Sequence, residues 1–302
     1  MTQDMDRLVE VIAKRVEEEL GRRTQKKAPS AASGSGKVAE CNTCPARGSC
    51  DPKMVIGAVN AGAARIGATP GIEAPPCSHV APLIDHTLLK PEATRDELRQ
   101  VCEEARRYNF ATVCVSSANV RYVAACLEGS NVKPIAVVGF PTGSSTQGAK
   151  SFETREAVRN GAQEIDMVIN IGALKSKDYV AVLEDIKAVV DAAGRVPVKV
   201  ILETSKLDHD EKVVASALSK AAGAAFVKTS TGFGGGGATP EDIALMRQIV
   251  GDEMGVKASG GVRTIDDVES LVKAGASRIG ASSSVAIVKC ERPKAGSAPK
   301  SY

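Results

Sequence analysis

The sequence predicts a (β/α)8 TIM barrel with an amino-terminal helical and cysteine-rich extension. Two observations lead to this fold class: apolar, β-rich runs recur eight times between residues 81 and 290, and amphipathic helical patterns separate them. This alternation is typical of a parallel sheet covered by helices, and eight repeats match the size at which such a sheet closes into a barrel. A doubly wound open sheet is the alternative, but no G-x-G-x-x-G motif follows the first run to support it.

The strand-like runs come in a regular order along the chain. They are expected at residues 83–89, 111–117, 134–140, 164–171, 196–204, 224–232, 255–261 and 277–283. Between them, apolar residues recur at helical spacing, as in 94–108 and 179–193, and these segments are predicted to form the outer layer of helices. We therefore expect residues 81–290 to form a single barrel domain.

The residues before the barrel differ from it in composition. From Met5 to Leu20, apolar residues recur at three- and four-residue steps, which places them on one face of a helix. The predicted division of the remaining chain is an amphipathic helix at 1–21, a flexible linker at 22–40, a cysteine-rich extension at 41–80 and a flexible tail at 291–302. AGAARIGA at 61–68 echoes AGASRIGA at 274–281, which suggests a helix–strand unit like the last barrel repeat.

Composition excludes several classes of function. The formal net charge is only +3, and the chain has no Trp, five Phe and four Tyr, so there is little basic or aromatic surface for nucleic acid. No apolar run is long enough to span a bilayer, and the first residues carry acids rather than a secretory apolar core. We therefore expect a cytoplasmic protein without nucleic-acid or membrane partners, whose eight cysteines stay reduced.

Ionisable residues end several of the predicted strands, where barrel enzymes carry their working groups. These residues are Asp85, Cys114, Asp166, Glu203, Lys228 and Lys257. Lys228 and Lys257 belong to consecutive strands, and two buried ammonium groups held close together disfavour protonation of both. One lysine should therefore be a neutral, nucleophilic amine for a carbonyl carbon. The alternative is that each lysine only pairs with a carboxylate such as Asp166 or Glu203.

Small residues follow the last three predicted strands, at 229–239, 259–261 and 280–284. Glycine lets backbone N–H groups approach an anion, and barrel enzymes often bind phosphate at the loops after their last two strands. The predicted phosphate donors are Gly260, Gly261, Ser282 and Ser283.

Four cysteines of the extension could hold a metal. Cys41, Cys44, Cys50 and Cys77 form a four-thiol set that could bind zinc or an iron–sulfur cluster. Their spacing fits neither common zinc patterns nor ferredoxin runs, so a redox-active thiol pair and inert cysteines are the alternatives.

The strand-end motifs carry a resemblance to a known family. In order along residues 81–289 they are LIDHTLLKPEAT, VCVSS, EIDMVINIGALK, VKVILET, FVKTSTGFGGGGAT, VKASGGVRT and RIGASSS. Together they resemble the deoxyribose-phosphate aldolases, which reversibly cleave 2-deoxy-D-ribose 5-phosphate to acetaldehyde and D-glyceraldehyde 3-phosphate without a metal or other catalytic cofactor. The resemblance implies a class I (Schiff-base) lyase that is a homo-oligomer.

The resemblance also implies roles for individual residues. Lys228 of VKTSTG corresponds to the Schiff-base lysine, Lys257 of VKASGG to the residue that depresses the pKa of Lys228, and Asp166 of EIDMVIN to the proton relay. The residues expected to bind substrate are Asp85, Thr87, Cys114, Thr231, Gly232, Gly260, Gly261, Ser282 and Ser283. Phe233 departs from the pattern, because some family members have lysine after TSTG, and this departure affects one expected phosphate contact.

The helix at the amino terminus resembles the encapsulation peptides that deliver enzymes into bacterial microcompartments. This resemblance implies a shell protein as a partner of residues 1–20, and the alternative is that the helix docks on its own barrel or within an oligomer. A different function was also considered: a redox or metal-cluster-carrying protein that uses the barrel as a platform.

Overall fold

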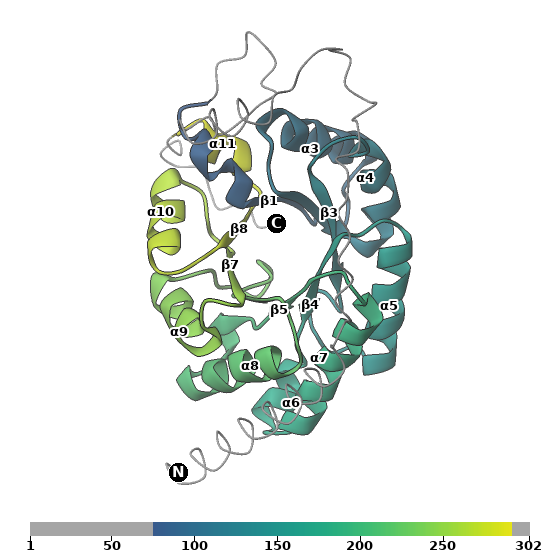
Figure 1. Ribbon diagram of the computed structural model, residues 1–302, viewed down its shortest axis with the longest axis vertical. Coiled ribbons are helices and arrows are strands. Elements are labelled where there is room, and N and C mark those ends of the chain that lie inside the picture. The colour runs from purple at the N-terminus through teal and green to yellow at the C-terminus, as the bar shows by residue number, and fades with distance from the viewer. Residues whose placement is uncertain (1–74, 292–302) are drawn as a thin grey trace, which may run out of the picture. The chain divides into compact units, whose positions relative to one another are not determined.

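In the computed structural model, residues 75–291 are described, and their strands close into an eight-stranded parallel barrel (Figure 1). The barrel order follows the chain order, with the last strand pairing to the first. The strands are β1 (Ile84–Leu88), β2 (Thr112–Ser116), β3 (Lys133–Val138), β4 (Glu164–Val168), β5 (Val198–Ile201), β6 (Phe226–Lys228), β7 (Gly255–Ser259) and β8 (Arg278–Ala281). The predicted (β/α)8 fold is confirmed, and each strand lies inside the run expected for it except β3, which begins one residue earlier, at Lys133.

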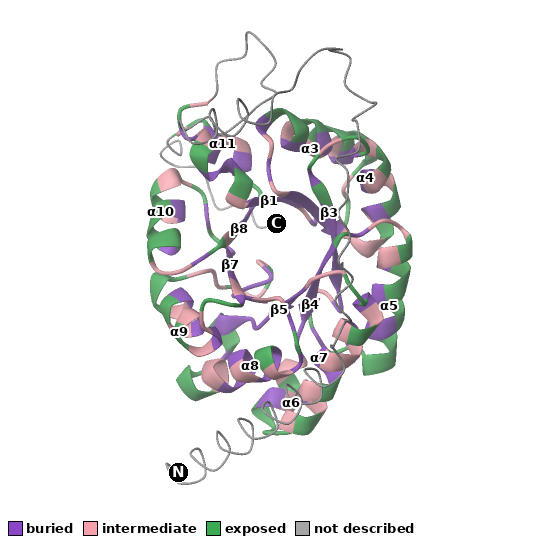
Figure 2. Ribbon diagram, in the orientation of Figure 1, coloured by how far each residue is buried: buried purple, intermediate pink, exposed green. Residues whose placement is uncertain are grey.

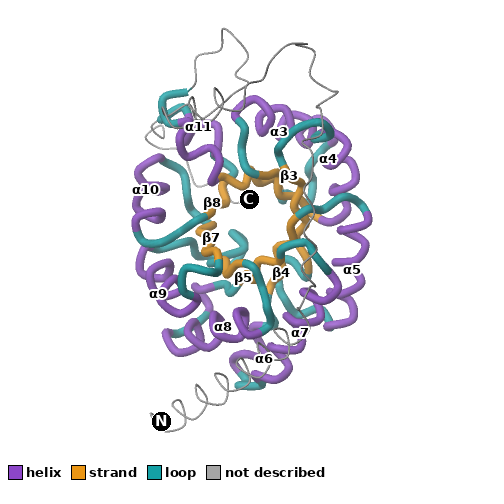
Figure 3. Tube along the Cα trace, in the orientation of Figure 1, coloured by secondary structure: helices purple, strands orange, loops and turns teal. Residues whose placement is uncertain are grey.

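Helices form the outer layer, and Figure 3 shows them around the ring of strands. They are α3 (Arg95–Tyr108), α4 (Val120–Cys126), α5 (Gln147–Arg159), α6 (Ile171–Lys175), α7 (Tyr179–Ala193), α8 (His209–Ala221), α9 (Pro240–Val250), α10 (Ile265–Lys273) and α11 (Ser284–Val288). Short 3-10 helices are η1 (Ser78–Leu83), η2 (Ser117–Asn119) and η3 (Thr204–Lys206).

Local capping explains where the two best-predicted helices begin and end. The Thr94 side chain accepts a hydrogen bond from the backbone N–H of Glu97, and the Glu97 carboxylate accepts one in return from the Thr94 N–H. This capping box satisfies two donors that the first turn leaves without partners. Helix α7 starts after Asp178, whose side chain accepts a hydrogen bond from the Ala181 N–H, and ends before Gly194, whose φ of 64° favours glycine.

Outward-facing strand residues bury against the helices and form the main core. Val113, Val115, Met167, Val200 and Ile279 have no exposed surface, and they belong to one apolar cluster together with the inner faces of the helices. Figure 2 shows this pattern as buried strands and helix faces that turn exposed toward the outside. Each such side chain contributes roughly 1.5–3 kcal/mol of burial energy, so the apolar alternation of the strands holds the barrel together.

Inward-facing residues fall into layers supplied by alternate strands, as is usual for this barrel. From the amino-terminal end, the period-two alternation gives Thr112, Glu164, Phe226 and Arg278 on even strands, then Asp85, Ile135, Lys199 and Lys257 on odd strands, then Cys114, Asp166, Lys228 and Gly280 on even strands. Most of these side chains are polar or charged, although the barrel interior is buried. Buried charges are costly unless paired, so this interior needs either ion pairs or a chemical role.

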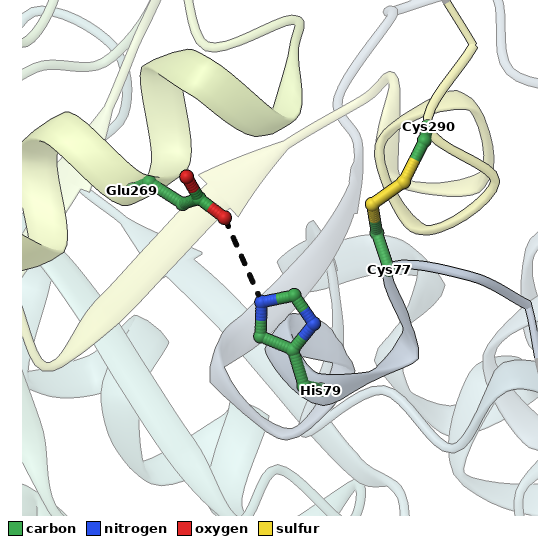
Figure 4. The surroundings of a disulfide bond; sticks show 4 residues. All are labelled: Cys77, His79, Glu269 and Cys290. Carbon is green, nitrogen blue, oxygen red and sulfur yellow. Dashed lines mark ion pairs between the residues drawn. A yellow bond between two sulfur atoms is a disulfide. The ribbon is translucent and has the colours of Figure 1, made fainter.

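The expectation that all cysteines stay reduced is wrong for two of them. Cys77 and Cys290 form a disulfide (Figure 4) with a Cα–Cα distance of 5.7 Å, inside the usual range for such bonds. It joins the segment before η1 to the end of α11, and the Cys77 N–H also donates to the Val288 carbonyl at 3.0 Å. A sequence separation of 213 residues hides this proximity from any reading of local spacing.

The disulfide also corrects the proposed four-thiol metal set, because Cys77 uses its sulfur in a covalent bond. Cys41, Cys44 and Cys50 lie outside the described residues, as do the predicted helix of residues 1–21, the linker at 22–40 and the echo at 61–68. Within residues 75–291, no helix is long and apolar enough to cross a membrane.

Candidate active site

Lys228 lies at the carboxyl end of β6 and is almost fully buried. Its ammonium nitrogen lies 2.8 Å from Asp166 Oδ2. Burial is the main cause that lowers the pKa of Lys228, and the positive charge of Lys257 acts in the same direction, whereas Asp166 opposes both. The net effect moves this amine toward the neutral form that attacks carbonyl carbon.

Lys257 is the register partner of Lys228 on β7. Its Nζ lies 2.7 Å from Asp166 Oδ2 and 2.6 Å from Asp85 Oδ2. Burial lowers the pKa of Lys257, but these two carboxylates more than offset that effect, so the pKa is raised. The pKa values of the adjacent lysines therefore move in opposite directions: Lys257 is held as an ammonium, and Lys228 is shifted toward a free amine.

Asp166 on β4 connects the lysines. It is fully buried; Oδ2 accepts from Lys228 and Lys257, and Oδ1 accepts from Lys199 at 2.8 Å. Burial raises the pKa of Asp166, but the lysine charges outweigh it and hold the pKa well below the usual range. The carboxylate is therefore ionised. Both lysines therefore do pair with a carboxylate, Asp166, as the alternative expected. Their pKa values nevertheless move in opposite directions.

Glu203 was the other carboxylate considered as a lysine partner, and it contacts a different group. It follows β5 with a φ of 57°, an uncommon left-handed conformation for a residue with a side chain. Its Oε2 accepts hydrogen bonds from the N–H of Thr231, at 3.1 Å, and from the Thr231 hydroxyl. Glu203 therefore anchors the loop that follows Lys228.

The expected residues on β1 and β2 lie around the lysines in different ways. Asp85 Oδ1 accepts hydrogen bonds from Thr112 at 2.8 Å and from Arg278 at 2.8 Å, and its Oδ2 is ion-paired with Lys257, so Asp85 belongs to the buried network below the site. The Thr87 hydroxyl donates to the Asp85 carbonyl at 2.9 Å.

Cys114 lies in the same layer as Lys228 and Asp166. It is fully buried, and burial is the main cause that raises the pKa of its thiol to about 11. The thiol is therefore neutral. Cys114 also belongs to a small apolar cluster with Leu89, Ile135 and Val137, against which Phe140 packs. The barrel interior thus has an apolar side at β2 and β3 and a charged side at the remaining strands.

The glycine-rich loop after β6 packs closely on the loop after β7. A Cβ at Gly237 would lie 2.5 Å from the Gly260 carbonyl oxygen, and the Ala238 N–H donates to that oxygen at 3.0 Å. Gly260 and Gly261 have φ values of 87° and 77°, which favour glycine. Phe233 contacts Phe140 edge to face, with ring centroids 5.4 Å apart.

The residues expected at the phosphate corner come from adjacent loops, because β7 and β8 are paired. Gly261 and Ser282 are exposed, Ser283 is half-buried and Gly260 is buried. The structure thus brings Gly260, Gly261, Ser282 and Ser283 to the carboxyl end of the last two strands. Such loops present N–H and hydroxyl donors suited to an anion.

Comparison with known proteins identifies the family. The sequence model of the DeoC/LacD family of aldolases matches residues 79–296. The chain is 57% identical to a deoxyribose-phosphate aldolase of Macrococcus caseolyticus over 216 residues, 72% of this chain and 98% of that protein. It is 60% identical to one from Streptococcus gordonii over 208 residues, 69% of this chain and 94% of that protein. The chain belongs to the DeoC/LacD aldolase family.

Solved structures agree with this DeoC/LacD assignment. The crystal structure of a putative deoxyribose-phosphate aldolase from Coccidioides immitis has a TM-score of 0.69 at 42% identity, covering 78% of this chain and 96% of that one. The tetrameric deoxyribose phosphate aldolase from Aeropyrum pernix has a TM-score of 0.66 at 33% identity, covering 70% and 90% respectively. The chain is thus an aldolase, a lyase, and aldolases of this kind need no cofactor for catalysis.

Sequence reasoning missed three charged residues of this aldolase's interior. They are Lys199, Glu164 and Arg278, which lie within two layers of Lys228. Lys199 contacts Asp166 and Glu164, and Arg278 contacts Glu164 and Asp85. The period-two alternation of the strands could have found them, because each of the three lies on the strand face that points into the barrel interior. Among residues 75–291, no group of three or more His, Cys, Asp or Glu side chains is arranged to hold a metal.

Proposed function

We propose that this aldolase reversibly cleaves 2-deoxy-D-ribose 5-phosphate to acetaldehyde and D-glyceraldehyde 3-phosphate through a Schiff base on Lys228. The observation that carries the proposal is the lowered pKa of a buried Lys228 amine 2.8 Å from an ionised Asp166. The 57–60% identity to proteins named deoxyribose-phosphate aldolase supports the choice of substrate.

The first step forms the imine. The neutral amine of Lys228 attacks C1 of the open-chain sugar, and the carbinolamine that results loses water to give an iminium ion. Asp166 and Lys257 exchange protons with the carbinolamine oxygen, directly or through water. Both are close enough to do so, because Asp166 Oδ2 contacts the Nζ atoms of both Lys228 and Lys257.

The second step breaks the carbon–carbon bond. A base removes the proton of the C3 hydroxyl, the C2–C3 electron pair moves toward the iminium nitrogen, and glyceraldehyde 3-phosphate leaves. The enamine that remains takes a proton at C2, and water hydrolyses the iminium to release acetaldehyde and the free Lys228 amine. Cys114 and the apolar side of the interior suit the methyl end of the two-carbon donor.

The third part of the proposal concerns the phosphate. Gly260, Gly261, Ser282 and Ser283 hold the phosphate at the open end of the barrel, while Thr231 and Gly232 border the substrate beside Lys228. Contacts with the non-reacting phosphate then contribute orientation at the reacting carbon. Phe233, which packs on Phe140, supplies an apolar contact rather than a charge next to this corner.

Two further proposals concern partners and place. We propose a homo-oligomer, since the relative from Aeropyrum pernix is described as a tetramer. We also propose that the apolar stripe of residues 1–20 addresses the enzyme to a shell protein of a bacterial microcompartment within the cytoplasm. Fusing residues 1–20 to a fluorescent protein tests this address: recruitment to the shell supports it, and diffuse fluorescence in shell-producing cells contradicts it.

The experiment that tests the proposed chemistry is borohydride trapping with acetaldehyde. Reduction of the iminium leaves an ethyl group on the lysine nitrogen, and peptide mapping should locate it on Lys228. Lys228→Ala should abolish both the label and the cleavage of deoxyribose 5-phosphate. Label found on Lys257 alone, or on no lysine, contradicts the proposal. Lys212→Met, a change in an ion pair on α8, is the control that should keep the label.

A further inference from the structure

The number of positive and negative charges inside the barrel depends on the protonation state of Lys228. Seven ionisable groups touch one another there: Asp85, Glu164, Asp166, Lys199, Lys228, Lys257 and Arg278. In their ordinary ionised forms, the three carboxylates equal the three cations other than Lys228. The cluster is therefore neutral when Lys228 is a free amine and carries one positive charge when Lys228 is protonated. A buried cluster favours the balanced state, because uncompensated charge is costly at low dielectric.

Lys199 has the central place in this balance. It is fully buried on β5, one layer below Asp166, and is the register partner of Asp166 on β4. Its Nζ lies 2.8 Å from Asp166 Oδ1 and 2.6 Å from Glu164 Oε2, with Asp85 Oδ2 at 3.9 Å. Lys199 thus bridges the carboxylate beside Lys228 to one that does not touch Lys228.

The inward-facing layer of Glu164, Phe226 and Arg278, nearer the amino-terminal ends of the strands, also holds Lys199 in place. The Arg278 guanidinium donates to Glu164 Oε2 at 3.0 Å and to Asp85 Oδ1 at 2.8 Å. Glu164 therefore lies between Arg278 and Lys199 and holds both cations in position. Phe226 closes this layer, with Lys199 Nζ 5.8 Å and the Arg278 guanidinium 5.4 Å from its ring centroid.

We propose that Lys199 is a positioning residue of the aldol reaction, which binds one oxygen of Asp166 and thereby leaves Lys228 only a share of the other. Oδ2 of Asp166 is already divided between Lys228 and Lys257. With Lys199 on Oδ1, the carboxylate faces three nitrogen donors, and its attraction for a proton on Lys228 is weakened. This inference rests on the proposed Schiff-base role of Lys228.

The charged and titratable groups of the barrel interior around Lys228 come from nearly every strand. They are Asp85 on β1, Cys114 on β2, Glu164 and Asp166 on β4, Lys199 on β5, Lys257 on β7 and Arg278 on β8. Cys114 is a neutral thiol, since burial raises its pKa to about 11. Lys133, at the exposed start of β3, is 3.8 Å from Glu164 and extends the network toward solvent. Changes at the buried positions should therefore act on Lys228 through charge.

The test is the pH dependence of kcat/KM for deoxyribose 5-phosphate in two variants with opposite expected signs. Lys199→Met removes a positive charge, so protonation of Lys228 becomes easier and its pKa rises. The acid limb should then move to higher pH by about one unit, which lowers the rate at neutral pH about tenfold and restores it in alkaline buffer. Glu164→Gln removes a negative charge, so the acid limb should move to lower pH.

The double variant Lys199→Met with Glu164→Gln restores the charge balance and should return the acid limb toward the wild-type position. A merely structural role for Lys199 would lower the rate by the same factor at every pH, and the double change would then not rescue it. Glu164→Gln preserves the shape of the side chain, so it carries the test if Lys199→Met does not fold. An unshifted acid limb in Glu164→Gln overturns the proposal.

Lys150→Met is the matched control. Lys150 is also fully buried and ion-paired, at 2.6 Å from Asp185 Oδ2, but it lies on α5 outside the barrel interior. It should lose thermal stability without moving the acid limb. Borohydride trapping of the wild-type protein separates the two hypotheses. Absence of label on Lys228 defeats the proposed function itself, whereas label on Lys228 with coincident pH profiles in all variants defeats only the role of Lys199.

Discussion

Lys228 and Lys257 are register partners on adjacent strands and share one oxygen of Asp166, yet their pKa values move in opposite directions. The difference lies in the number of carboxylates that each amine reaches. Lys257 contacts Asp85 as well as Asp166, which offsets its burial, whereas Asp166 is the only carboxylate of residues 75–291 that Lys228 contacts. One lysine of the buried pair is thus held as a cation, and the pKa of the other is shifted toward the free amine.

Lys257→Leu should therefore slow the aldolase and move the acid limb of its kcat/KM profile to higher pH. The positive charge of Lys257 lowers the pKa of Lys228, so its removal raises that pKa and leaves less free amine below it. A shift of about one unit or more is expected, together with slower proton transfer at the plateau. An acid limb that stays in place or moves to lower pH contradicts this account.

Gly237→Ala should weaken the binding of phosphorylated sugar. Its Cβ would lie 2.5 Å from the Gly260 carbonyl oxygen and 2.9 Å from the carbonyl carbon, so the loop after β7 has to move. We expect KM for deoxyribose 5-phosphate to rise about tenfold, with a much smaller change for unphosphorylated deoxyribose. Gly148→Ala, whose Cβ would meet no atom within 4 Å, is the control. Equal losses on both sugars would place the phosphate elsewhere.

Much of this site followed from the sequence, because strand alternation and the order of the strands are local properties. Lys228 ends β6 as expected, whereas Lys257 and Asp166 lie in the middle of β7 and β4, and strand alternation turns all three toward the barrel interior. Lys199 and Arg278 escaped notice because they lie in the first half of their strands rather than at the carboxyl ends, and only the barrel's closure brings them to Glu164 and Asp85.

The disulfide is a second feature that could not be predicted from the local sequence. Nothing near Cys77 or Cys290 distinguishes them from the buried Cys102 or the half-buried Cys126, which are free. Their pairing depends on η1 and α11 lying against each other, a contact that exists only once the first and last strands have paired. The four-thiol interpretation failed at Cys77 because spacing along the chain does not report such closure.

Reduction of the disulfide should lower the thermal stability of the oxidised protein. The bond closes a loop with a sequence separation of 213, and a loop of that order restricts the unfolded chain by up to about 5 kcal/mol. Differential scanning fluorimetry should show a lower Tm with a reducing agent, and the same lower Tm for Cys77→Ser with or without it. Cys126→Ser should respond to the reducing agent as the wild type does. An identical response of Cys77→Ser and wild type would contradict the bond.

The last prediction concerns Gly280, which occupies the β8 position in the inward-facing layer that holds Lys228. Gly280 on β8 contributes no side chain there, and a Cβ at this position would lie 3.0 Å from Lys257 Cε and 2.9 Å from Ser259 Cβ. The long side chain of Lys257 passes through this space on its way to Asp166 and Asp85. Glycine at 280 is therefore required by the neighbouring Ser259 and Lys257 side chains rather than by its own backbone.

Gly280→Ala should displace the Lys257 ammonium and reproduce part of the Lys257→Leu phenotype. A misplacement of about 1 Å at the reaction centre costs about tenfold to a hundredfold in rate. Overpacking, in contrast, costs the folded barrel only about 1–3 kcal/mol. The measurements are kcat, the acid limb of kcat/KM, and Tm for the same preparation. A rate loss accompanied by an upward shift of the acid limb assigns the effect to Lys257. A loss of Tm with an unchanged pH profile and wild-type kcat would show instead that Ser259 yields to the new methyl group and that the position of Lys257 does not depend on Gly280.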